Sequence, residues 1–91
     1  MLRARVDSKH REIADSLIAF GCSVQSLHKV GNGCPDLLVG YRGREYLLEV
    51  KSKGCKAKPN QQEWHRTWKG SFVRVVYTME EAARAVGLEI S

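Results

Sequence analysis

The fold of this 91-residue chain is decided by residues 33–51, which read GCPDLLVGYRGREYLLEVK. Two apolar runs in this stretch, 37–41 and 46–50, are separated by Arg42-Gly43-Arg44. A break of that length with a central glycine is what a β-hairpin turn requires. The stretch therefore predicts two antiparallel strands.

Three charged side chains lie on this hairpin where the interior of a sheet would carry none. Side chains alternate between the two faces of a strand, so Glu49 and Lys51 share one face. Antiparallel pairing about Gly43 brings Asp36 beside them. We therefore expect two carboxylates, well separated in sequence, to be neighbours in space.

A cation is the usual companion of two adjacent carboxylates, because they repel each other and lose hydration when half-buried. Oxygen ligands favour a hard ion, Mg²⁺ or Mn²⁺, and the carbonyl of Val50 offers a further ligand. The alternative is a surface salt bridge between Glu49 and Lys51, which is the common interpretation of an isolated E-x-K. The combination of Pro-Asp at the start of one strand with Glu-Val-Lys at the end of its partner is much rarer, and it favours the metal site.

The same residues resemble the signature of a nuclease superfamily. Pro35-Asp36 followed by Glu49-Val50-Lys51 resembles the PD-(D/E)XK motif. The surroundings are similar to the small, stand-alone, phage-type VRR-NUC branch of that superfamily. Arg11-Glu12-Ile13 is similar to the first-helix glutamate motif of the branch, and Pro59-Asn60-Gln61 to its glutamine motif. The resemblance covers about 11–87.

This resemblance implies a restriction-endonuclease-like α/β fold, a mixed β-sheet flanked by helices, in one nuclease domain over 1–91. It implies metal-dependent cleavage that leaves a 5′ phosphate. It also implies that Glu12 is a third acidic residue near the metal, and that Gln61 holds the catalytic lysine or the phosphate. By position alone, Glu12 is an exposed helix charge and Gln61 a solvated first-turn residue.

The spacing of apolar residues, together with capping residues and glycines, predicts the helices and strands around the hairpin. Helices are expected over 8–20, 59–69 and 78–86, since capping residues precede them and glycines follow. Strands are expected over 22–28 and 71–77. The order is then α-β-β-β-α-β-α, with the third and fourth strands as parallel neighbours.

Finer expectations concern the faces and caps of these helices. Asn60 and Glu63 stand at capping-box spacing. Trp64 and Trp68 lie one turn apart, an arrangement that is more often core than a base-stacking platform. The first helix carries an apolar stripe expected to pack on the sheet, made of Ile13, Leu17 and Phe20 with Ala14 and Ile18 beside it.

The charge is basic and unevenly placed. The chain has 15 Lys and Arg against 10 Asp and Glu, a net charge of +5, which favours a polyanionic partner. A run of charge is usually a solvated loop. Beside a metal site, we interpret the run as a clamp on the DNA backbone, formed by Lys53, Lys56 and Lys58 after the Lys51 of the motif. Lys29 and Asn32, in a glycine-flanked loop, are further candidates for phosphate contact, although a plain turn explains that loop equally well.

Other classes of protein have little support in the sequence. Three cysteines without a CxxC spacing favour neither disulfides nor zinc, and a Cys/His zinc site drawn from His10, His28 or His65 has no supporting spacing. No apolar run approaches the ~20 residues that span a bilayer, and the basic N-terminus lacks the apolar core of a secretory signal. We expect a cytoplasmic protein with reduced thiols, no membrane contact and no small-molecule cofactor.

Together these features predict a Mg²⁺-dependent endodeoxyribonuclease. Lys51 is expected to orient or deprotonate the attacking water, or to stabilise the transition state as a cation. No sequence-reading module is visible, so specificity should rest on the backbone and shape of branched DNA. Cutting two strands needs two active sites, which favours a homodimer. Stand-alone members of the branch look like four-way (Holliday) junction resolvases, so we expect that activity here.

Three alternatives remain open. The first is a nicking or flap endonuclease without junction preference. The second is a non-catalytic DNA-binding protein that uses Asp36 and Glu49 structurally. The third, a small toxin-like RNase, draws only on basic charge and size. The habits of the branch also imply a phage or prophage protein of a bacterial host, acting in DNA recombination, repair or packaging.

Overall fold

The hairpin turns through two residues, Arg42 and Gly43, whose φ angles are both positive, 53° and 78°. This is the backbone of a type I′ turn, whose twist matches that of the flanking strands. In the computed structural model, which describes residues 8–88, β2 (Leu37–Tyr41) and β3 (Arg44–Val50) pair antiparallel. The second strand therefore begins earlier than the apolar run indicated, because the turn uses two residues instead of three.

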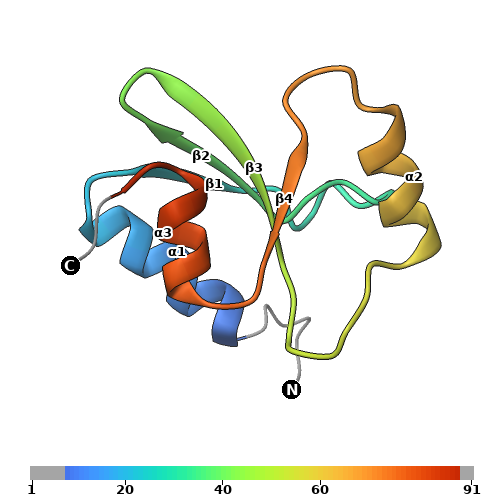
Figure 1. Ribbon diagram of the computed structural model, residues 1–91, viewed down its shortest axis with the longest axis horizontal. Coiled ribbons are helices and arrows are strands. Elements are labelled where there is room, and N and C mark those ends of the chain that lie inside the picture. The colour runs from blue at the N-terminus through green and yellow to red at the C-terminus, as the bar shows by residue number, and fades with distance from the viewer. Residues whose placement is uncertain (1–7, 89–91) are drawn as a thin grey trace.

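Two further strands complete a sheet in the order β1-β2-β3-β4 (Figure 1). β1 (Ser23–Ser26) pairs antiparallel with β2, and β4 (Val73–Val76) pairs parallel with β3. The parallel pair is joined by a crossover through α2 (Pro59–Thr67). The predicted mixed α/β sheet and the order α-β-β-β-α-β-α are confirmed.

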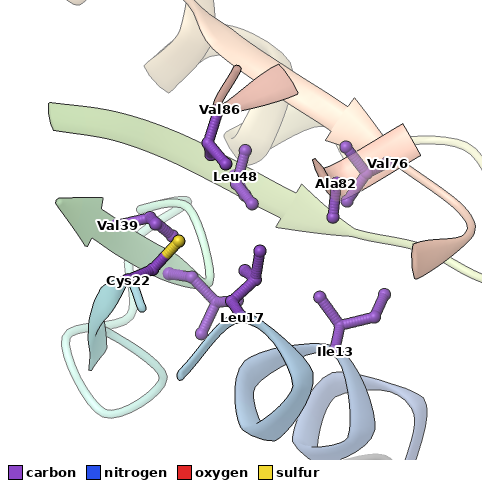
Figure 2. Close-up of a cluster of buried hydrophobic side chains, with 9 residues drawn as sticks. Ile13, Leu17, Cys22, Val39, Leu48, Val76, Ala82 and Val86 are labelled. Atoms are coloured by element: carbon purple, nitrogen blue, oxygen red, sulfur yellow. The ribbon is translucent and has the colours of Figure 1, made fainter. Parts of the chain in front are cut away.

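One face of the sheet is covered by α1 (Ser8–Ala19) and α3 (Met79–Ala85), which lie side by side (Figure 1). Figure 2 shows Ile13 and Leu17 of α1 directed toward Leu48 and Val76 of the sheet. The buried cluster consists of Ile13, Leu17, Cys22, Leu37, Val39, Leu48, Val76, Ala82 and Val86. Leu37 and Val39 of β2 and Leu48 of β3 all belong to this cluster, so alternation directs Asp36 and Glu49 to the opposite face.

The apolar stripe of α1 is narrower than predicted. His10, Ile13 and Leu17 are buried, whereas Ile18 is 53% exposed and Phe20 is 52% exposed. The helix ends at Ala19, so Phe20 follows it in the turn that leads to Gly21, where φ is 100°. The expectation that Phe20 packs on the sheet was wrong, because helical spacing does not extend past the end of the helix.

The second helix, α2, lies on the far side of β3 and β4 from α1 and α3 and buries no residue completely (Figure 1). Its N-cap is Lys58, and the third helical residue, Gln61, accepts the backbone N–H of Lys58 at 2.8 Å. The predicted capping pair, Asn60 with Glu63, was therefore wrong by two residues. Trp64 and Trp68 stack with ring centroids 4.4 Å apart, but Trp68 is 48% exposed and so is not a core residue.

The last helix, α3, is capped by Thr78. The backbone N–H of Glu81 donates to Oγ1 of Thr78 at 3.1 Å, and the Glu81 carboxylate accepts the N–H of Tyr77. Across residues 8–88, none of the helices has the length and apolarity needed to cross a bilayer.

Candidate active site

The hairpin register brings the two predicted carboxylates together. Leu37 faces Leu48 across the strands, so Asp36 comes next to Glu49. The Asp36 N–H donates to the carbonyl of Leu48 at 3.0 Å, and Oδ2 of Asp36 accepts the N–H of Val50 at 2.8 Å. These two bonds hold the aspartate against β3 from both its backbone and its side chain.

Glu49 is the most deeply buried charged residue of this site, with a side chain only 1% exposed. Its Oε2 accepts a hydrogen bond from Nε2 of Gln61 at 2.9 Å and lies 3.6 Å from Nζ of Lys51. Its Oε1 accepts no hydrogen bond from the described residues. One oxygen is thus held in place and the other is left free.

Gln61 connects the motif residues to α2. Its Oε1 accepts Nζ of Lys51 at 2.9 Å and the N–H of Lys58 at 2.8 Å, while its Nε2 donates to Glu49. A glutamine suits this position because its amide is both donor and acceptor. The lysine side chain, 13% exposed, is therefore oriented by the start of the helix.

Electrostatics at the site follow from burial and from the paired carboxylates. Burial raises the pKa of Glu49 from 4.5 to about 7; the Asp36 charge also raises it, and Lys51 acts in the opposite direction. Burial lowers the pKa of His65, and the charge of Lys51 lowers it further. Burial likewise raises the pKa of the Cys34 thiol, to which both carboxylates add. A raised pKa is what a carboxyl of a buried acid pair without a cation should show.

The donor set fits a hard divalent ion. The free Oε1 of Glu49 and the neighbouring Asp36 supply anionic oxygens, which such ions prefer. Within residues 8–88, no three His, Cys, Asp or Glu side chains form a ready metal-binding group. Water, phosphate or backbone oxygens would therefore complete the coordination, as is usual for Mg²⁺.

Among residues 8–88, no hydrogen bond or ion pair links Glu12 to this pair. Glu12 is exposed on α1, and α1 packs on the sheet face opposite to α2. The predicted DNA-contact residues are all exposed. Lys29 and Asn32 lie in the loop before β2, and Lys53, Lys56 and Lys58 lie between β3 and α2. Lys53 and Lys56 also line a cavity of about 530 Å³ with Lys9, Tyr77 and Glu81.

The loop before β2 packs directly on the start of α2. Gly33 is buried with φ 84°, and a Cβ at this position would collide with the backbone carbonyl of Asn60. The close approach of the two backbones requires glycine. Gly33 therefore fixes where Gln61 stands relative to β3, a role that differs from the predicted approach to phosphate.

The sequence interpretation missed His65 as a member of the site. Nε2 of His65 lies 4.0 Å from Oε1 of Glu49. The available signal was its spacing from Gln61, since residues four apart share one face of a helix. That spacing shows that His65 shares a face with Gln61. It shows that His65 lies near Glu49 only when the packing of α2 on the sheet is known.

One of three comparisons with known proteins finds a similar fold. No family model matches the sequence, and no curated protein is similar to it. A solved structure described as a VRR_NUC domain is similar in fold, with a TM-score of 0.68 and 29% sequence identity. The alignment covers 85% of this chain and 89% of that chain.

The fold, with the Pro-Asp and Glu-x-Lys strands side by side, defines a nuclease domain of the PD-(D/E)XK type. Within that class, the structural similarity supports membership of the VRR-NUC family.

Proposed function

We propose that this protein is a metal-dependent, structure-specific DNA endonuclease that resolves four-way junctions as a homodimer. The observation that carries the proposal is the bonded set of Lys51, Gln61 and Glu49 beside Asp36. A merely structural salt bridge would not need a half-buried glutamine to hold the lysine, nor leave one oxygen of a buried carboxylate free.

Asp36, Oε1 of Glu49 and the carbonyl of Val50 would hold Mg²⁺ or Mn²⁺. When bound, such an ion lowers the pKa of water and stabilises negative charge on a phosphate. Lys51 orients the attacking water or stabilises the charge that develops on the phosphate. Gln61 keeps Nζ of Lys51 within 3.6 Å of Glu49, so the cation stays next to the carboxylate pair.

The exposed lysines around the site bind the DNA backbone. Each Lys that neutralises a phosphate releases counterions and strengthens binding without reading sequence. The segment after β3 contains Lys53, Lys56 and Lys58. The loop before β2, which packs on α2, contains Lys29 and Asn32. Glu12 is proposed to assist the site from α1, on the strength of the family motif alone.

Junction preference and dimerisation are tested with one panel of substrates. The purified protein is incubated with an immobile four-way junction, a flap, a nicked duplex and a linear duplex of equal length, with Mg²⁺, Mn²⁺ or EDTA. Paired metal-dependent cuts confined to the junction, with 5′ phosphate ends, support the proposal. Equal rates on linear duplex refute junction specificity, and tight binding without cutting under any metal indicates a non-catalytic DNA-binding protein.

A further inference from the structure

The side of the active site formed by α2 carries a histidine that the proposed chemistry does not use. Gln61 and His65 lie four residues apart and face the two oxygens of one carboxylate: Gln61 donates to Oε2 of Glu49, and His65 approaches Oε1. The helix thus holds one oxygen and brings Nε2 of His65 near the other.

The second oxygen of the Glu49 carboxylate and the histidine nitrogen that approaches it both lack a hydrogen bond within the described part of the chain. Oε1 of Glu49 and Nε2 of His65 are both buried and have no hydrogen-bond partner among residues 8–88. Their separation of 4.0 Å is longer than a hydrogen bond. Buried polar atoms without hydrogen-bond partners are uncommon in folded proteins, and such atoms often contact a water molecule or an ion.

A direct hydrogen bond between the two side chains does not supply that explanation, because 4.0 Å is too long for one. A neutral imidazole is the form that binds metals. Two metal–ligand bonds of about 2.1 Å span up to about 4.2 Å, close to the observed gap.

We propose that Nε2 of His65 is a nitrogen ligand of the divalent cation held by Oε1 of Glu49, so that the site prefers a transition-metal ion such as Mn²⁺ over Mg²⁺. This inference rests on the proposed metal-dependent function and adds a residue to its metal site. Imidazole ligands favour transition metals, whereas Mg²⁺ prefers sites made of oxygen alone.

The first test measures metal binding without DNA. Calorimetric titration of the metal-free protein with MnCl₂ and with MgCl₂ is performed on the wild type, His65→Gln and His28→Gln. We expect Mn²⁺ to bind the wild type more tightly than Mg²⁺. In His65→Gln the Mn²⁺ affinity should fall by about tenfold or more, and the Mg²⁺ affinity by less than about threefold, because glutamine offers only an amide oxygen. His28 is exposed, so His28→Gln should leave both affinities unchanged.

The second test detects a nitrogen ligand directly. Electron spin echo envelope modulation of Mn²⁺ bound to the wild type should show coupling to an imidazole ¹⁴N nucleus, and this coupling should persist in His28→Gln. Circular dichroism and thermal unfolding verify that His65→Gln is folded.

The outcomes separate this inference from the proposed function. Binding of both ions without nitrogen coupling, and with equal Mn²⁺ affinity in the wild type and His65→Gln, refutes the histidine ligand and leaves a metal-dependent nuclease in which water fills the gap. Failure of the wild type to bind either ion refutes the metal site as a whole.

Discussion

Gln61 is the side chain on which the geometry of the site depends most, because it bonds to both Lys51 and Glu49. We predict that Gln61→Leu lowers the cleavage rate by about 10–100-fold, the usual effect of removing a residue that orients catalytic or metal-binding groups. DNA affinity should change little, since the leucine adds and removes no charge. Rates at saturating junction DNA measure the effect.

Gln62→Leu is the matched control for this variant. Gln62 is the next residue of α2, is exposed, and donates from its side chain to the backbone carbonyl of Ala57. An equal loss of activity in the two variants would show that the effect comes from the helix and not from the bonds of Gln61.

Glu49 should make the stability of the metal-free protein depend on pH. Its pKa is raised to about 7 in the folded state, so the folded protein binds a proton more tightly than the unfolded chain does. Its contribution to stability is therefore full below about pH 4.5 and is lost as the pH rises toward 7. We predict that Glu49→Gln gains up to about 3 kcal/mol relative to the wild type between pH 5 and pH 8.

Denaturant unfolding in EDTA at several pH values measures this difference. The lowered pKa of His65 acts with the opposite sign below its ordinary value of 6.5. Because His65 is present in both proteins, comparison with Glu49→Gln cancels most of its contribution. A difference in unfolding free energy that stays constant with pH would contradict the predicted state of Glu49.

The loop before β2 and the helix α2 are joined where Gly33 meets the backbone of Asn60. We predict that Gly33→Ala displaces the start of α2, destabilises the protein by about 2 kcal/mol or more and lowers cleavage, since both the positive φ and the space are unsuitable for a side chain. Thermal unfolding and cleavage rates measure the two effects.

Gly31→Ala separates the effect of a positive φ angle from the effect of a collision with α2. Gly31 has φ 73° but nothing within 4 Å of an added Cβ, so only the conformational cost of about 1–2 kcal/mol applies. Cleavage at the wild-type rate is expected for this variant. A similar loss of activity in both variants would show that contact with α2 is not what matters.

The elements differ in how well the sequence predicts them, for physical reasons. The hairpin and the adjacency of Asp36 and Glu49 follow from local alternation and turn residues, so they were predictable. The exposure of Phe20 and Trp68 was not, because it depends on where a helix ends and on which elements pack against it. The approach of His65 to Glu49 depends on the long-range contact of α2 with the loop before β2, which no local pattern reports.

Across the whole molecule, the net charge of +5 should make DNA binding strongly dependent on salt. The segment after β3 concentrates this charge on the side of the cavity lined by Lys53 and Lys56. We predict that the double variant Lys53→Ala, Lys56→Ala lowers the slope of log affinity against log salt concentration by about 1.8, or about 0.9 for each phosphate that is no longer neutralised.

The control is a double variant that removes two positive charges outside the segment after β3. Arg44 lies at the start of β3 beside the hairpin turn, and Arg84 lies in α3, and both are exposed. The double variant Arg44→Ala, Arg84→Ala should keep the wild-type slope. An equal decrease of the slope in the two double variants would indicate a general effect of net charge in place of a local DNA clamp.

Asp36→Asn provides the most direct test of metal-dependent cleavage at this site. Asparagine keeps an oxygen that can accept the N–H of Val50, so the hairpin should fold normally while one anionic ligand is removed. Junction binding and cutting are measured on the same folded sample in Mg²⁺ and Mn²⁺. We predict unchanged or tighter binding and a loss of cutting of about 10³-fold or more. Cutting at the wild-type rate by folded Asp36→Asn would contradict the assignment of the active site.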